Sequence, residues 1–365
     1  MDILETPARR RVSGRARLAW LAAVVAAATA VVVVKVAPRG DDSPQSTPSP
    51  GTPAAVPVVS GAGAVVQLTG FPADAEGVPL PRRFDPAGPE LSTRPIERAI
   101  ALYQPNFDWE HETHPGPIWA LSADHTWAEL DRLGLEYIRD AGGNKATPMR
   151  STSLSPDGRH AAFPQPGAVV IVELSTAAIT RVAVPGLNEH VIWAPDSASL
   201  IVGGDGAAAR RVRLAGGRPA EVGFNVWNLA AGPSPLGSVE VGDPARIDQT
   251  PLDPWAVDEW YGRGWLSPGG DMVARSGWVH TPSTAGTEAV AVLELGRDAK
   301  SRAVHLLAFG RDEPKACCEV LGWLSAHTVL LNAQRYGVLC WDVEGGIVTR
   351  ATEPVQGVLS LPDLG

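Results

Sequence analysis

The chain has 365 residues, with 31 Lys or Arg, 40 Asp or Glu and a formal net charge of −9 at pH 7. Residues 1–39 contain seven of the basic and two of the acidic residues, so the remainder has 24 basic against 38 acidic residues, a net charge of −14. This excess repels phosphate groups, and it excludes nucleic acid and an anionic lipid surface as partners of that part of the chain.

The first predicted element is a membrane-spanning helix in residues 18–37. Residues 18–34 (LAWLAAVVAAATAVVVV) carry no charge, and a helix of that length reaches about 26 Å, close to the thickness of a hydrocarbon core. Five arginines precede this run, whereas only Lys35 and Arg39 follow it closely. Because basic residues stay on the cytoplasmic side, residues 1–17 are predicted to be a cytoplasmic tail of a single-pass plasma-membrane protein whose large domain is extracytoplasmic.

A cleaved signal peptide is the alternative for the same segment. Residues 28–30 (Ala-Thr-Ala) have the small-x-small form that a signal peptidase cleaves. Cleavage after Ala30 would leave residues 31–34, four valines, as an exposed apolar end, and the apolar run is longer than a signal core of about 7–15 residues. An uncleaved signal anchor therefore explains the segment better.

Residues 38–64 are predicted to be a disordered linker. Residues 40–57 (GDDSPQSTPSPGTPAAVP) are rich in Pro, Ser, Thr and Gly and offer almost no apolar surface. Folding could not compensate for the conformational entropy that such a segment would lose. The folded extracytoplasmic domain is therefore expected in residues 65–365, enough chain for a sizeable core.

A pattern that recurs from Trp119 onward predicts an all-β fold. Each copy has a short apolar strand, a turn of the Ser-Pro-Asp-Gly type, a second apolar strand, and a third strand joined by a tight turn to a fourth. The clearest copies begin at residues 153–158, 192–196, 264–271 and 322–325. Weaker copies begin at residues 118–124 and, in third-strand form, at residues 224–232.

These residues resemble the TolB-like and WD-repeat β-propeller families, in a membrane-anchored bacterial form, over about residues 120–350. The resemblance implies a β-propeller of about five to six four-stranded blades, a fold that implies binding but no particular reaction. Trp193, Trp265 and Trp323 are expected to fill the space between blades. The spacings of 35, 39, 72 and 58 residues are irregular and the regular Gly-His positions of WD repeats are absent, which favours the TolB-like description.

Three cysteines are too few for a disulfide scaffold. Cys317 and Cys318 are adjacent, and Cys340 is expected on the third strand of the blade that Cys318 begins, too far away for a bridge between those two. Unpaired, buried thiols are the expectation, although an extracytoplasmic location would permit disulfides.

A weak candidate metal site consists of Asp108, His111 and His114, whose side chains could act as ligands if the segment were helical. Prolines on both sides favour a solvated acidic loop instead. We therefore predict no metal, no cofactor and no catalytic residue. The alternative that keeps this site is an extracytoplasmic hydrolase or lyase with a metal on the propeller face.

A candidate ligand site lies in residues 248–263 (DQTPLDPWAVDEWYGR), interpreted as an insertion where the blade pattern lapses. It combines the aromatic residues Trp255, Trp260 and Tyr261 with the carboxylates of Asp258 and Glu259. Flat apolar area beside oriented acceptors suits sugars or cationic peptides. The competing interpretation is that these aromatic residues fill the core of a missing blade.

The chain has no Gly-x-Ser-x-Gly elbow, Gly-rich phosphate loop or Cys-x-x-Cys pair, so the sequence gives little support to an enzyme. We therefore expect a membrane-tethered extracytoplasmic β-propeller that acts as a non-catalytic binding or scaffolding module. Its predicted partner is a protein or another cell-envelope ligand.

Overall fold

The computed structural model describes residues 65–105, 113–139, 143–204, 208–223, 226, 229–232, 256–281, 284–295, 301–310 and 317–364. The predicted cytoplasmic tail, membrane helix and linker in residues 1–64 lie outside this set. Among the described residues, no helix has the length and apolar character needed to cross a membrane.

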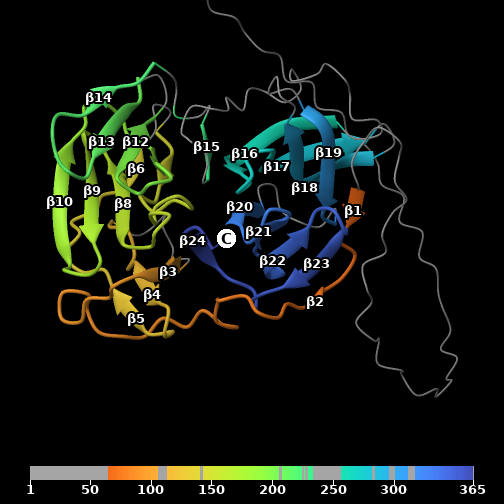
Figure 1. The fold of residues 1–365 in the computed structure, drawn as a ribbon, viewed down its shortest axis with the longest axis horizontal. Helices are drawn as coiled ribbons and strands as arrows, with labels where there is room; N and C mark the ends of the chain where they lie inside the picture. Colours follow the sequence, from red (N-terminus) through yellow and green to blue (C-terminus); the bar gives the residue numbers. More distant parts are fainter. Residues whose placement is uncertain are drawn as a thin grey trace, which may run out of the picture. The chain divides into compact units, whose positions relative to one another are not determined.

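The described residues form an all-β, propeller-like arrangement of small sheets (Figure 1). The first sheet has the order β24 (Gly357–Ser360), β3 (Ala99–Pro105), β4 (Trp119–Ser122), β5 (Trp127–Glu129). The second is β10 (Ala178–Ala183), β9 (Ala168–Glu173), β8 (His160–Gln165). The third is β11 (His190–Trp193), β12 (Ser199–Gly203), β13 (Arg210–Arg213), β14 (Ala220–Glu221).

Two larger sheets and one hairpin complete the described part. The fourth sheet is β1 (Val65–Gln67), β19 (Ser301–Ala308), β18 (Thr284–Leu295), β17 (Met272–Thr281), β16 (Ala256–Leu266), β15 (Ala230–Ala231). The fifth is β2 (Ala73–Asp74), β23 (Ile347–Arg350), β22 (Gly337–Asp342), β21 (Thr328–Ala333), β20 (Cys318–Trp323). The hairpin is β6 (Ile138–Arg139) with β7 (Lys145–Ala146).

Each sheet other than the β6–β7 hairpin has one segment that we call its lead strand. The lead strands are β11, β16, β20, β24 and, beside the second sheet, residues 151–155, which adjoin β8 only through the isolated Leu154–Ala161 bridge. Four of them begin a run of consecutive antiparallel strands, as the repeat predicts, and the earlier strands β1, β15 and β2 join these runs in parallel. The exception is β24, which joins β3 from more than 250 residues later in the chain. The sequence pattern did not reveal this pairing.

The predicted turns are present with a common backbone geometry. In the first clear copy the Ser155 hydroxyl donates to Asp157 Oδ1 (2.6 Å) and accepts from the backbone N–H of His160 (2.9 Å). Its fourth residue, Gly158, has φ +70°, and a Cβ there would lie 2.3 Å from the carbonyl oxygen of Ala99. The corresponding residues of three other copies also have positive φ: His125 (62°), Ser197 (56°) and Gly270 (72°).

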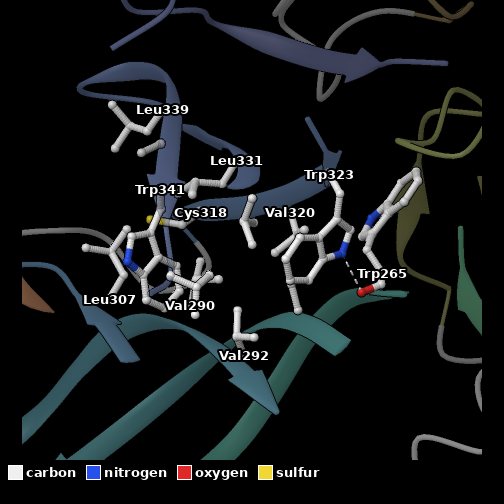
Figure 2. Packing of buried hydrophobic residues seen from close by; sticks show 14 of the residues in the cluster. Trp265, Val290, Val292, Leu307, Cys318, Val320, Trp323, Leu331, Leu339 and Trp341 are labelled. Atoms are coloured by element: carbon white, nitrogen blue, oxygen red, sulfur yellow. Dashed lines mark hydrogen bonds between the residues drawn. The ribbon is translucent and has the colours of Figure 1, made fainter. Parts of the chain in front are cut away.

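The expected tryptophans pack between neighbouring sheets. Trp193, Trp265 and Trp323 retain only 4%, 9% and 5% of their exposure. The indole N–H of Trp323 donates to the carbonyl oxygen of Trp265 (2.9 Å), as Figure 2 shows, and that of Trp193 donates to the carbonyl oxygen of Ser153 (3.1 Å). Each bond joins two lead strands, so the tryptophans connect sheets through hydrogen bonds as well as apolar contact.

The structure corrects three sequence-based interpretations. Residues 256–263 are not an insertion but the first part of β16, which pairs with β17. Of the third strand predicted at 224–232, only β15 is described as a strand, and it pairs in parallel with β16. Cys317 and Cys318 are not free thiols, because they form a disulfide, whereas Cys340 is free and buried as expected. Two adjacent cysteines gave no pattern from which this bond could be predicted.

We predict that Trp341→Ala strongly destabilises the domain. Trp341 is fully buried in a cluster that also contains Val290 and Leu307 of the fourth sheet (Figure 2). Removing a buried tryptophan side chain costs about 3–5 kcal/mol. Urea denaturation should show this loss, whereas Ile347→Ala, at a side chain that is 60% exposed, should change the unfolding free energy by less than about 0.5 kcal/mol. Equal effects of the two substitutions would contradict the packing described.

Candidate functional site

The two ends of the lead strands differ in chemistry. Their last residues supply Leu154, Trp193, Trp265, Trp323 and, just after β24, Leu361 to one hollow, which we call the tryptophan hollow. It has a cavity volume of about 40 Å³. Because its three tryptophans are buried and two of their indole N–H groups already bond to backbone, this hollow is mainly a seam of packing between sheets.

A larger hollow opens near the start of two lead strands, residues 151–155 and β24. It has a cavity volume of about 310 Å³, and we call it the polar hollow. Its lining residues are Gln104, Pro105, Tyr137, Lys145, Ala146, Thr147, Arg150, Gln334, Gln356, Gly357 and Val358. The charged side chains among the described lining residues are Lys145 and Arg150, and none of these described residues carries a carboxylate. In a chain with a large excess of acidic residues, this composition is unusual.

Hydrogen bonds hold several lining side chains in place. Arg150 Nε donates to the carbonyl oxygen of Glu189 (2.8 Å), which fixes the plane of the guanidinium. Gln104 Nε2 donates to the carbonyl oxygen of Gly116 (2.9 Å), and its Oε1 accepts from the hydroxyl of Thr147. Lys145 Nζ lies 3.8 Å from the ring centroid of Tyr137, a cation–π contact. The lining is therefore largely organised before any ligand arrives.

Behind Arg150 lies a group of interacting charges, which we call the charged cluster: Arg150, Glu189, His190, Arg263 and Glu319. Burial lowers the pKa of Arg150, and the charges of Glu319 and Glu189 oppose that effect. Burial likewise raises the pKa of Glu319, against a hydrogen bond with Ser151 and the charge of Arg150. Members of this cluster come from three lead strands and from residues directly before two of them.

The other two members of the charged cluster are His190 and Arg263. Burial, with the charges of Arg263 and Arg150, holds the pKa of His190 well below its usual range, so its imidazole is neutral at pH 7. Burial lowers the pKa of Arg263 to about 9, and the guanidinium remains charged at neutral pH. Arg263 donates to the carbonyl oxygens of Val226 and Leu229, the latter at 3.1 Å. Backbone acceptors therefore offset part of the cost of burying this charge.

The sequence-predicted ligand residues lie elsewhere. Trp255 is outside the described residues, and Asp258 is described only as part of the backbone of β16. On the same strand Glu259 is exposed, and Trp260 packs partly buried against a small cluster around Leu293, with Arg275 5.8 Å from its ring. Tyr261 is half-buried. None of these residues lines either hollow.

The candidate metal ligands are only partly visible. Asp108 and His111 lie outside the described residues, and His114 is exposed just before β4. Within the described ranges, no three His, Cys, Asp or Glu residues gather closely enough to hold a metal ion. The described residues thus add nothing in favour of the hydrolase or lyase alternative.

The sequence did contain a signal for the charged cluster. Arg150, His190, Arg263 and Glu319 each occur two to four residues before the bulky apolar residue of a lead strand: Leu154, Trp193, Trp265 and Trp323. Because each of these copies has a titratable residue two to four positions before its bulky apolar residue, these titratable residues are expected to lie near one another in the fold. Gln104 and Gln356, in contrast, meet only through the pairing of β24 with β3.

Comparison with known proteins leaves the family open. No protein-family model and no curated protein matches this chain. Among solved structures, it is similar to an oligogalacturonate lyase in complex with manganese, at 13% identity and a TM-score of 0.27, covering 60% of this chain and 59% of that one. It is also similar to a structure described as the eukaryotic initiation factor, at 12% identity and a TM-score of 0.29, covering 71% of this chain and 62% of that one. The chain thus spans under two thirds of either structure, and such distant likenesses indicate no activity.

The lowered pKa of His190 predicts a loss of stability in acid. An unfolded histidine binds a proton near pH 6.5, whereas folded His190 binds it only at lower pH, so stability falls as pH drops below about 6.5, by at most about 1.4 kcal/mol per pH unit. Urea denaturation between pH 7.5 and 5.5 should show a smaller loss for His190→Asn than for the wild type. His125→Asn, at an exposed turn position, should retain the wild-type slope. Identical slopes for all three proteins would contradict the burial of a neutral His190.

Proposed function

We propose that this protein is a non-catalytic binding module and that its ligand enters the polar hollow. The observation that carries the proposal is a preorganised, largely polar lining whose charged members, Lys145 and Arg150, belong to an otherwise acidic chain. Ligand sites in proteins usually occupy about 300–1,000 Å³ and present a few fixed polar groups. The polar hollow fits that description.

The charged cluster supports the same location. Buried titratable groups with shifted pKa values occur preferentially at functional sites, because burying charge is costly for stability alone. Arg150 belongs both to this cluster and to the lining, so a ligand in the hollow would contact a charge that the domain already holds in place.

The apolar run in residues 18–34 leads us to propose an extracytoplasmic location for this binding module. With an uncleaved anchor and the linker in residues 38–64, the binding module would be tethered outside the plasma membrane. Its partner would then be a protein or another ligand of the cell envelope. The resemblance of the repeats to membrane-anchored TolB-like propellers agrees with such a role.

The proposal predicts that filling the polar hollow abolishes capture of the envelope ligand. Full-length protein, purified in detergent and immobilised, would be incubated with a cell-envelope extract, and retained material would be quantified by mass spectrometry. Thr147→Trp places a large side chain in the lining, and it should reduce retention at least about tenfold, as loss of a central contact does.

The matched control is Thr180→Trp, which adds the same side chain to the exposed strand β10. It should retain the ligand as the wild type does, and thermal melts should confirm that both variants are folded. Equal retention by all three proteins would show that the ligand does not use the polar hollow. Turnover of a generic esterase, glycosidase or phosphatase substrate would contradict the non-catalytic role.

A further inference from the structure

The polar hollow has two positively charged side chains and no carboxylate among its described lining residues. Lys145 and Arg150 line it, and Gln334 and Gln356 lie exposed at its rim. An ammonium and a guanidinium are donors only, whereas the glutamine amides both donate and accept hydrogen bonds. The lining therefore suits a ligand that combines a negative group with neutral polar groups.

Arg150 is the anchor of this arrangement. Among the described residues, its guanidinium donates one hydrogen bond, from Nε to the carbonyl oxygen of Glu189. A guanidinium held through Nε presents its terminal nitrogens in a fixed plane, and a planar fork of donors matches the two oxygens of an oxyanion. Fixing the plane in advance also lowers the entropy lost when an anion binds.

The surrounding charges limit how negative the ligand can be. The carboxylates of Glu319 and Glu189 act electrostatically on Arg150, so part of its positive charge is already opposed within the domain. A singly charged carboxylate therefore suits the hollow better than a doubly charged phosphate, which the same two carboxylates would repel more strongly.

The size of the hollow sets a second condition. Its cavity volume of about 310 Å³ is far more than a bare carboxylate needs. The remainder of the ligand would lie between the rim amides of Gln334 and Gln356, where hydroxyl or amide groups find hydrogen-bond partners. Purely apolar ligands would leave these groups unsatisfied.

From this geometry, and resting on the proposed function, we infer that the polar hollow binds a small molecule that carries one carboxylate together with several hydroxyl or amide groups. The acidic sugars and the carboxyl ends of short peptides share this chemistry. In either case the carboxylate lies against Arg150 and Lys145, and the neutral groups contact the glutamines at the rim.

The test is isothermal titration of the full-length protein with probes that differ only in charge. D-glucuronate is compared with D-glucose, N-acetyl-dialanine with its C-terminal amide, and glucose 6-phosphate serves as a dianion. At least one carboxylate should bind about tenfold more tightly than its neutral partner, the usual size of a charge-assisted contact. Tighter binding of D-glucuronate would indicate an acidic sugar as the ligand. Tighter binding of N-acetyl-dialanine would indicate the carboxyl end of a peptide.

Two variants locate the binding. Arg150→Gln and Lys145→Gln should each weaken carboxylate binding, the first by about tenfold or more. Because Arg150 also bonds to the backbone, thermal melts accompany this variant, and Lys145→Gln tests the inference independently if the first does not fold. Arg181→Gln on the exposed strand β10 removes a positive charge away from the hollow and should bind as the wild type does.

The inference is overturned if charged and neutral partners bind equally, if none of the probes binds, if glucose 6-phosphate binds most tightly, or if both lining variants retain wild-type affinity for the carboxylate. These results would not affect the capture experiment with Thr147→Trp. If Thr147→Trp loses capture of the envelope ligand but one of these titration results is found, the binding function stands. The carboxylate class of ligand is then rejected.

Discussion

The hydrogen bonds between tryptophans and lead strands are the constraint on which the arrangement of both hollows depends. When the indole N–H of Trp323 donates to the carbonyl oxygen of Trp265, two lead strands are held together at their apolar ends, and Trp193 holds another pair through Ser153. Fixing one end of each strand also fixes the other end. The polar residues at those other ends, including Arg150 and Glu319, are thereby brought within electrostatic reach of each other.

This arrangement separates two requirements of the domain. The apolar ends are buried and contribute the hydrophobic free energy that stabilises the fold. The polar ends contain a charged cluster whose burial is costly, since carboxylates and guanidinium groups lose hydration there. Stability alone would favour apolar residues at Arg150, Arg263 and Glu319. Arg150 also lines the polar hollow, and we propose that ligand binding there is the reason for this buried charge.

Much of the fold could be predicted from local patterns. The Ser155–Gly158 turn and its relatives act within a few residues, and the apolar runs that became β8, β9, β12, β21, β22 and β23 are visible as such in the chain. The pairing of β24 with β3 could not be predicted, because it joins segments more than 250 residues apart with no distinctive sequence. The disulfide between Cys317 and Cys318 was missed because only the fold brings their side chains into a bonding geometry.

The candidate site was harder to predict for the same reason. Aromatic and acidic residues concentrated in residues 248–263 attracted attention, yet the described part of that segment is a sheet strand with Trp260 packed against apolar neighbours. The polar hollow instead gathers single residues from β3, the β6–β7 hairpin and the residues before two lead strands. Its charges are separated in the sequence by ordinary strand residues. The membrane anchor in residues 18–34 remains a prediction from composition.

The most direct measurement of the central claim is a crystal structure of the protein with the tightest-binding carboxylate probe. We expect the carboxylate in the polar hollow, with an oxygen about 3 Å from a guanidinium nitrogen of Arg150. A ligand located in the tryptophan hollow, or against Glu259 and Tyr261 on β16, would contradict it.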